Sequence, residues 1–312
     1  MSTRQNLINT WGSQNITFFE ETIWSSSIQQ LDLPKVRDFL EANNFNFFDV
    51  SIVRPPKSDL SRILWKYHYD ETGQCISTNY QKEILENSNH LKLVIGLEEK
   101  ENNDSYQNKT ISIINILRLV FGVPIAKELM LLNHFNKDNY IGSSNSKEGF
   151  ASPFLNQSLN MFPDIKDLKI KDLPVEAAIL LDKAFEQEFP IERFILMWTG
   201  FEAIINYIEP GNKQTGDKRI SYFRKLGSKL INDEVFRIFK IRCNLFKEAK
   251  FMSLKEIENE NWSLYAIIQL TIMEDCPVKT KFLKGYENLL EEKNSLSKIN
   301  LKEESSFAIT NP

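Results

Sequence analysis

Glu202 and Arg242 are charged residues on the apolar faces of two segments that have helical periodicity. In residues 191–208 and 234–248 the apolar side chains recur at steps of three and four, and each charged residue falls on that stripe. The stripes are Ile191, Phe194, Ile195, Trp198, Phe201 and Ile205 in the first segment, and Val235, Ile238, Phe239, Leu245 and Phe246 in the second. A lone buried charge is costly, so buried charges are normally paired. We therefore expect Glu202 and Arg242 to face each other between two packed helices.

Such a pair has two interpretations. It can be a structural ion pair that fixes the register of two helices. It can also orient Arg242 to bind phosphate, because the planar guanidinium is always charged and binds two phosphate oxygens at once. The sequence leaves both interpretations open.

The charge of the chain is unevenly distributed. The net charge is only -4, so no global basic field indicates a nucleic-acid partner. Residues 211–251 nevertheless contain eleven basic and four acidic residues, so this stretch carries +7 and the remainder about -11. The basic side chains either lie on solvated helix faces or form a surface for an anionic ligand around Arg242.

Several classes of site have no support in the sequence. The three histidines, His68, His90 and His134, precede the helical region, and none has a metal-ligand spacing, so we expect neither a metal nor a cofactor. Three cysteines form no disulfide framework, and there is no signal peptide or membrane-spanning run. These features predict a cytoplasmic location and no contact with a membrane.

Residues 211–218 have the Gly-x4-Gly spacing of a phosphate-binding loop. The lysine is displaced by Asp217, and no serine or threonine follows Lys218. The segment also follows a predicted helix, where a phosphate loop would follow a strand. We therefore expect a turn between two helices, with Asp217 as the N-cap of the second.

The pattern of the chain predicts an α+β fold with a strand-rich N-terminal domain over residues 1–135. Alternating apolar residues predict strands, with a hairpin turn at 70–73 and a loop at 98–108. Residues 110–121 read as a helix, and the Asn-, Ser- and Gly-rich residues 133–163 as a long loop, so residues 136–173 are assigned to a linker. An all-α bundle is expected over 174–293, followed by a loose polar tail over 294–312. Its helices are predicted at 175–189, 191–208, 217–230, 234–248, 254–273 and 278–292.

The helical half resembles a HEPN domain of the ApeA-like kind found in prokaryotic defence and toxin proteins. Three passages carry the resemblance, which covers roughly residues 175–293: residues 193–203 with Trp198 and Glu202, residues 219–223, and residues 241–247. The last resembles the arginine-to-histidine motif of the family, and residues 117–122 resemble what precedes such domains. The resemblance implies a HEPN-like helical bundle that forms homodimers and cuts RNA without a metal.

By resemblance, Arg242 occupies the arginine position of the composite site and Asn244 the polar position. Lys247 occupies the histidine position, five residues after the arginine, and Glu202 orients the arginine. A histidine exchanges a proton near neutral pH, whereas an ordinary lysine stays a cation, so whether the protein is an enzyme stays open. Lys218, Arg219, Lys240 and Lys250 are the expected binding residues.

Three functions follow from these residues. The first is an RNA-interacting HEPN-like protein that acts as a weak or conditional ribonuclease, in which the ribose 2′-hydroxyl attacks its own phosphate while Arg242 and Lys247 neutralise charge. The second is a catalytically inactive dimerisation subunit that docks a protein partner in a defence complex. The third is a nucleotide sensor that uses the same basic groove. The missing histidine favours the second, and the basic stretch favours the first or the third.

Overall fold

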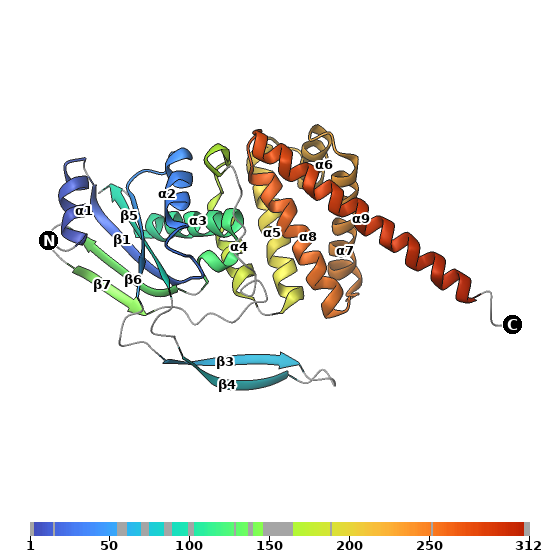
Figure 1. Ribbon diagram of the computed structural model, residues 1–312, viewed down its shortest axis with the longest axis horizontal. Coiled ribbons are helices and arrows are strands. Elements are labelled where there is room, and N and C mark those ends of the chain that lie inside the picture. The colour runs from blue at the N-terminus through green and yellow to red at the C-terminus, as the bar shows by residue number, and fades with distance from the viewer. Residues whose placement is uncertain are drawn as a thin grey trace.

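The computed structural model has an antiparallel sheet in its N-terminal part and a run of helices after it, which confirms the predicted α+β layout (Figure 1). It describes residues 3–14, 16–54, 61–69, 75–83, 89–98, 103–127, 129–136, 140–145, 165–187, 189–250 and 252–308. Among these residues, no helix has the length and apolar character needed to cross a membrane.

The main sheet has five strands in the order β2-β5-β1-β6-β7, and all neighbouring strands are antiparallel. The central strand β1 pairs with β5 on one side and with β6 on the other. Its residues are therefore buried almost continuously along the strand. A separate hairpin of β3 and β4 lies apart from this sheet (Figure 1). The strands are β1 (Ile16–Ser25), β2 (Phe48–Val53), β3 (Ser61–Tyr69), β4 (Cys75–Glu83), β5 (His90–Glu98), β6 (Leu129–Asn136) and β7 (Tyr140–Asn145).

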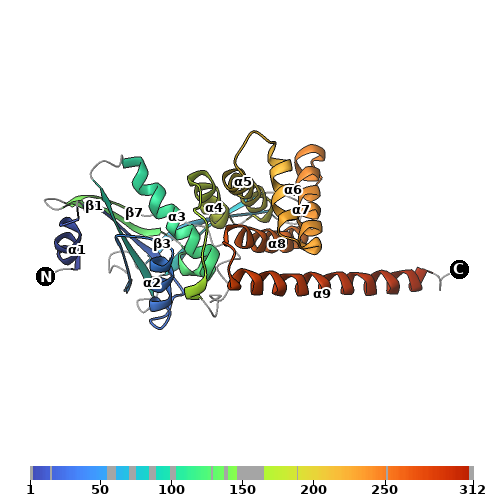
Figure 2. The ribbon, with the colours of Figure 1, turned by 90° about the horizontal axis from the view of Figure 1, so that it is seen from above.

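Helices cover both faces of the main sheet. Helix α1 (Thr3–Gly12) packs on one face over a small core that includes Phe19 and Val94. It packs so closely that a Cβ atom at Gly96 would lie 2.9 Å from the ring carbon Cε3 of Trp11. Helices α2 (Leu33–Ala42) and α3 (Asn103–Phe121) cover the other face, where alternate β5 residues enter the main core. Figure 2 shows α1 and α3 on opposite sides of the sheet.

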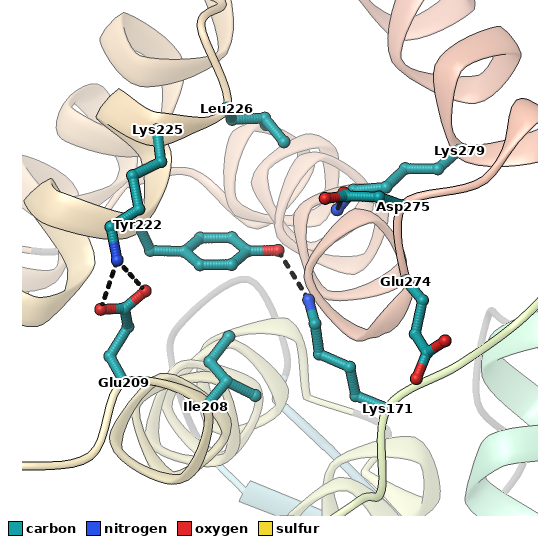
Figure 3. A pocket seen from close by; sticks show the side chains of 9 residues that line it. All are labelled: Lys171, Ile208, Glu209, Tyr222, Lys225, Leu226, Glu274, Asp275 and Lys279. Carbon is teal, nitrogen blue, oxygen red and sulfur yellow. Dashed lines mark hydrogen bonds and ion pairs between the residues drawn. The ribbon is translucent and has the colours of Figure 1, made fainter.

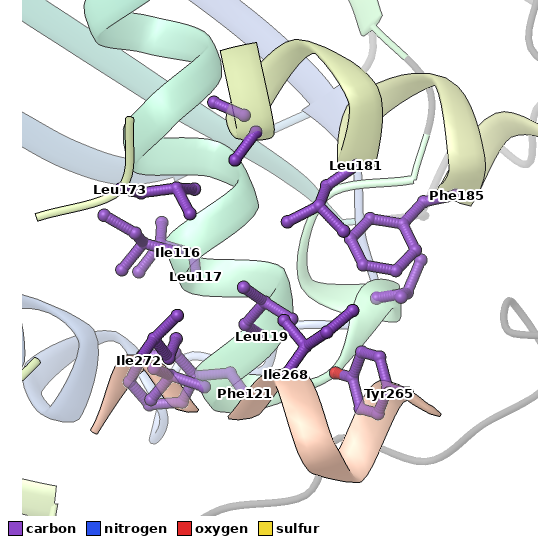
Figure 4. Packing of buried hydrophobic residues seen from close by; sticks show 14 of the residues in the cluster. Ile116, Leu117, Leu119, Phe121, Leu173, Leu181, Phe185, Tyr265, Ile268 and Ile272 are labelled. Carbon is purple, nitrogen blue, oxygen red and sulfur yellow. The ribbon is translucent and has the colours of Figure 1, made fainter. Parts of the chain in front are cut away.

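Helix α3 joins the sheet to the helical bundle. Its residues 113–121 are nearly all buried, and they contact the sheet and α2 as well as α4 and α8. Figure 4 shows this junction, where side chains from α3, α4 and α8 and from Leu173 interdigitate. The buried cluster is continuous from Trp24 in the sheet to Leu290 in the last helix. One hydrophobic core therefore fixes the sheet against the bundle.

Six helices follow residue 174. They are α4 (Val175–Glu186), α5 (Pro190–Ile208), α6 (Thr215–Lys225), α7 (Lys229–Glu248), α8 (Leu254–Ile272) and α9 (Pro277–Ala308). Sequence signals mark several of their ends: Pro190 lies in the first turn of α5, and Ser253 and Glu256 form a capping box at the start of α8. Helix α9 continues past the rest of the bundle toward the C-terminus (Figures 1 and 2).

A buried arginine, Arg118, holds the junction together through polar contacts. Its guanidinium is 1% exposed and donates to the carboxylate of Asp182 on α4 at 2.7 Å. It also donates to the carbonyl oxygens of Ala126 at 2.7 Å and Lys127 at 3.0 Å, and it lies over the ring of Trp24. One side chain thus connects β1, α3, the turn after α3, and the bundle.

Several sequence predictions are wrong in detail. Helix α1 was not expected, and the predicted loop at 98–108 contains the start of α3. The predicted loop at 133–163 contains the end of β6 and all of β7, because pairing with β6 overrides the weak strand preference of that composition. Residues 294–308 are helical, although a loose tail was expected. The N-cap of α6 is Gln214, and Asp217 lies within its first turn. The expected turn at 70–73 falls outside the described residues.

A second buried charge cluster lies on the α1 face of the sheet, around Glu21. Its carboxylate accepts hydrogen bonds from Arg4 at 2.5 Å and Asn133 at 2.9 Å, and it pairs with Lys92 at 3.0 Å. Burial alone would raise the pKa of Glu21, but these donors and charges outweigh it and lower the pKa from 4.5 to about 2. The ionised carboxylate is therefore part of the folded state.

We predict that replacing Arg118 by methionine lowers the free energy of unfolding by about 3–5 kcal/mol, because it leaves the carboxylate of Asp182 buried without its cation. Lys166→Ala is the control, since Lys166 pairs with Asp38 at the surface and such pairs contribute less than about 1 kcal/mol. Urea denaturation measures both variants. Equal stability of the two variants would contradict the role given to Arg118.

We also predict a loss of stability in acid that depends on Glu21. The pKa of this carboxyl is lower in the folded chain than in the unfolded one, so its contribution is complete above pH 4.5 and declines as the pH falls toward about 2. In Glu21→Gln the unfolding free energy should be lower at pH 7 and should fall less steeply between pH 4.5 and 2. Denaturant titrations across that pH range measure both slopes, and identical slopes would contradict the prediction.

Candidate functional site

The predicted partner of Glu202 is wrong: its carboxylate pairs with Arg219 of α6, where Arg242 was expected. The Nη1 atom of Arg219 lies 3.5 Å from Oε1 of Glu202. Among the described residues, no ion pair joins Glu202 to Arg242. The guanidinium of Arg219 is 5% exposed and Glu202 is 25% exposed. Glu202 is therefore beside a buried arginine, as expected, but the arginine comes from the helix that follows it in the chain.

The packing of three helices explains this choice. Arg219 lies four residues before Phe223, a core residue, so both point from α6 toward α5 and α7. Its Cζ atom lies 4.1 Å from the ring centroid of Phe239 on α7 and 5.2 Å from that of Trp198 on α5. These two aromatic rings hold the guanidinium by cation–π contact, so residues of the apolar stripes of α5 and α7 also surround the charge of Arg219.

Arg242 lies near this cluster as a second cation. It is half-buried, and its Cζ atom lies 4.9 Å from the ring centroid of Phe246, one turn further along α7. Burial lowers the pKa of Arg219, and the positive charge of Arg242 lowers it further, whereas Glu202 and Cys243 act in the opposite direction. Two guanidinium groups therefore lie close enough to repel each other, and Glu202 pairs with one of them, Arg219.

Both guanidinium groups have a buried N–H donor that is not hydrogen-bonded. Nε of Arg242 and Nε1 of Trp198 have no hydrogen-bond partner among the described residues, and Nη1 of Arg219 has only its 3.5 Å ion-pair contact with Oε1 of Glu202, which is not a hydrogen bond. A buried donor without a partner is rare and costs about 1–3 kcal/mol, more when the group is charged. These donors would be satisfied by an anion, such as a phosphate oxygen, bound between α5, α6 and α7.

The other predicted site residues divide into buried and exposed groups. Lys218 is 8% exposed beside Arg219, and no described residue forms an ion pair with it. Asn244 and Lys247 are exposed near the C-terminal end of α7, and so is Lys250, whose backbone N–H caps the helix by donating to the carbonyl of Asn244. Lys240 is exposed on the same helix, where its ammonium lies 4.6 Å from the ring centroid of Phe236.

The site thus has a buried part and a surface part. Arg219 and Arg242 form an inner cationic cluster, and Lys218 is buried next to Arg219 in the chain. Lys240, Asn244 and Lys247 form an outer row along α7, and Lys250 lies just beyond the end of that helix. Phe236 and Phe246 are 52% and 51% exposed on the same helix. Cations interleaved with exposed aromatic rings can contact both the phosphates and the bases of a nucleic acid.

The described residues contain no group of three or more His, Cys, Asp or Glu side chains that could hold a metal ion. His134 is hydrogen-bonded through Nε2 to the buried carboxylate of Glu20 at 2.9 Å, within the sheet. The side chains of the arginine cluster themselves can supply charge stabilisation and hydrogen bonding.

The sequence contained a signal for Arg219 that the stripe analysis did not use. Arg219 and Phe223 are four residues apart, which is the same spacing that places Glu202 behind Trp198. The signal could have shown that α6 also carries a charge on its apolar face. It could not have shown which of two arginines reaches Glu202, because that depends on how three helices cross.

Comparisons with family models, with curated proteins and with solved structures found no match to this chain.

We predict that Glu202→Ala lowers the free energy of unfolding by about 1–3 kcal/mol, because Arg219 would keep a buried charge without a counter-ion. Adding Arg219→Met to that variant should restore part of the loss. Glu209→Ala is the control, since Glu209 pairs with the exposed Lys225. Urea denaturation of the three variants measures their free energies of unfolding. A Glu202→Ala protein as stable as the unmodified chain would contradict the pair.

Proposed function

We propose that the protein is a HEPN-like RNA-interacting protein of a prokaryotic defence or toxin system, with its RNA site on α5, α6 and α7. The observation that carries the proposal is the neighbouring pair of buried Arg219 and half-buried Arg242, each of which has a buried N–H without a hydrogen bond that a phosphate oxygen would satisfy. The motif resemblance around Arg242 points to the same ligand, and the proposed location is the cytoplasm.

The proposed mode of binding uses the two parts of the site differently. Arg242 lies at the edge of the inner cluster, half-buried, and holds one phosphate. Lys240, Lys247 and Lys250 on the exposed row neutralise neighbouring phosphates, which makes the affinity dependent on salt. Asn244 hydrogen-bonds to the ribose or the phosphate from the same face.

Cleavage, where it occurs, proceeds without a metal. The ribose 2′-hydroxyl attacks the adjacent phosphorus, the bond to the 5′ oxygen of the next nucleotide breaks, and a cyclic phosphate is left. Arg242 stabilises the charge that develops on the phosphate oxygens. Residues five apart on a helix point about 140° from each other, so Lys247 reaches the same phosphate only around the end of α7 or from the second chain of a dimer, where Asn244 positions the group. Lys247 stands where the family motif has histidine. No side chain at this position therefore exchanges a proton near neutral pH, and the expected rate of cleavage is low.

A second function is supported by the exposed aromatic rings of α7. Phe236 and Phe246 are each about half exposed, and exposed apolar side chains are also typical of protein–protein interfaces. On this proposal the helical part forms a homodimer or docks a protein partner, and the arginine cluster is structural. A dimer that neither binds nor cuts RNA would support this function over the first.

The test uses a mixed pool of labelled RNAs in buffer that contains EDTA. We predict that Arg242→Ala and Lys247→Ala each weaken RNA binding about tenfold or more, because each removes a charged phosphate contact. Any cleavage by the unmodified chain should be lost in both variants. Lys284→Ala on α9 is the matched control, since it removes one exposed lysine from another helix and should leave binding within about twofold.

Binding that weakens equally in Lys284→Ala would indicate non-specific attraction and would contradict the site. Absence of binding by the unmodified chain would overturn the RNA proposal, and light scattering would then distinguish a dimer from a monomer.

A further inference from the structure

A separate cavity lies where the segment after the sheet meets the ends of three bundle helices. Its volume is about 510 Å³, which is within the range of small-molecule sites. Figure 3 shows its lining, with Tyr222 of α6 crossing the middle of the view. The lining residues are Lys171, Ile208, Glu209, Tyr222, Lys225, Leu226, Glu274, Asp275 and Lys279.

The position of Lys171 is fixed by neutral acceptors. Its ammonium donates to the carbonyl oxygens of Thr271 at 2.9 Å and Met273 at 3.2 Å, and to the hydroxyl of Tyr222 at 3.1 Å (Figure 3). The two carbonyl groups belong to the C-terminal end of α8, where a cation is favourable. All three N–H groups are used, and no described carboxylate forms an ion pair with Lys171. It therefore brings a fixed positive charge to the cavity wall.

Lys279 brings a second positive charge. It lies near the start of α9, is 8% exposed, and pairs with the carboxylate of Asp275 at 2.8 Å. Asp275 itself is 97% exposed, so solvent screens this pair and it holds Lys279 weakly. The start of α9 adds the positive end of a helix dipole and has no acidic residue in its first turn.

The two lysines repel each other. Burial is the largest cause that lowers the pKa of Lys171 from 10.5 to about 8, and the charge of Lys279 acts in the same direction, against the opposing effect of Asp275, Glu274 and Glu209. A dianion bound beside Lys279 would relieve this repulsion. Lys279 has two N–H groups not used by Asp275, and they can donate to such an anion.

The rest of the lining fits the remainder of a small organic molecule. Ile208, Leu226 and the ring of Tyr222 supply apolar surface, and the carboxylates of Glu209 and Glu274 can accept hydrogen bonds from hydroxyl groups. Glu209 pairs with Lys225, which is 64% exposed. This ion pair therefore lies on the side of the cavity that faces solvent. A cavity of this size is larger than inorganic phosphate requires.

We propose that this cavity binds a small hydroxylated phosphate monoester, with its phosphate group at Lys279 and near Lys171. Sugar phosphates and nucleoside monophosphates share this chemistry. The site uses none of the arginine-cluster residues, so it stands independently of the RNA proposal.

The test measures binding of ribose 5-phosphate and adenosine 5′-monophosphate by calorimetry, with ribose and adenosine as uncharged controls and inorganic phosphate as the bare anion. We expect both phosphate esters to bind the unmodified chain more tightly than inorganic phosphate does, and the uncharged controls not to bind. The ester that binds more tightly shows whether the ligand is a sugar phosphate or a nucleoside monophosphate.

Three variants locate the site. Lys279→Gln should weaken binding about tenfold or more, because it removes the donor to the phosphate. Asp275→Asn should tighten binding a few-fold, because it removes the carboxylate that competes for Lys279, and its high exposure makes loss of the fold unexpected. Lys284→Gln, at an exposed lysine of the same helix as Lys279 that lies outside the cavity lining, should stay within about twofold.

A second readout follows Lys171. Bound phosphate should raise the pKa of its amine, so the midpoint pH for reaction with an amine-specific reagent, read by mass spectrometry, should move upward from about 8. Failure of all three phosphate probes to bind at millimolar concentration would overturn the proposal. Equal binding of ribose and ribose 5-phosphate, or weaker binding by Asp275→Asn, would do so as well.

Discussion

The placement of Arg118 is the constraint on which the joint between sheet and bundle depends. A guanidinium with 1% exposure has to find a partner for each donor, and the partners are supplied by three separate parts of the chain: Asn115 on its own helix, the carbonyls of the turn after α3, and Asp182 on α4. These requirements can be met in one relative arrangement of α3, α4 and the sheet only. The apolar contacts around α3 supply the energy of the joint, and the polar contacts of Arg118 determine its geometry.

The arginines of the bundle differ in how far their donors are satisfied. Arg193 is fully buried, and it donates to Glu258 at 2.7 Å and to the carbonyl of Gln187 at 2.6 Å. Arg237 is bonded to Glu234 and Glu260. Against these, the unused donors of Arg219 and Arg242 stand out. Among the described residues, Arg118 and Arg193 are buried and hydrogen-bonded, whereas buried Arg219 and half-buried Arg242 each keep a buried N–H without a hydrogen bond, and this contrast is the physical basis of the proposed RNA site.

The local elements were largely predictable, because their signals are local. Alternation located β2 and β5, and the three- and four-residue periodicity located α5 and α8 within a residue or two. The errors arise where distant contacts decide. Strand β7 forms because β6 offers a free edge, and its own residues carry little strand preference. Glu202 selects Arg219 because three helices cross, and Arg118 was visible only as an interruption in an apolar run. Single-segment patterns do not contain that information.

Helix α6 carries a residue of each proposed site, Arg219 facing α5 and α7, and Tyr222 crossing the cavity. The two positions are three residues apart, which is less than one turn and about 4.5 Å along the axis. A helix is stiff over so short a length, so a displacement of Tyr222 is transmitted to Arg219. Thermodynamic linkage then requires reciprocity: by whatever factor occupancy of the cavity changes the affinity of the arginine cluster, occupancy of the cluster changes the affinity of the cavity by the same factor. The eleven residues of α6 would in that case serve as the connecting element of a two-ligand protein.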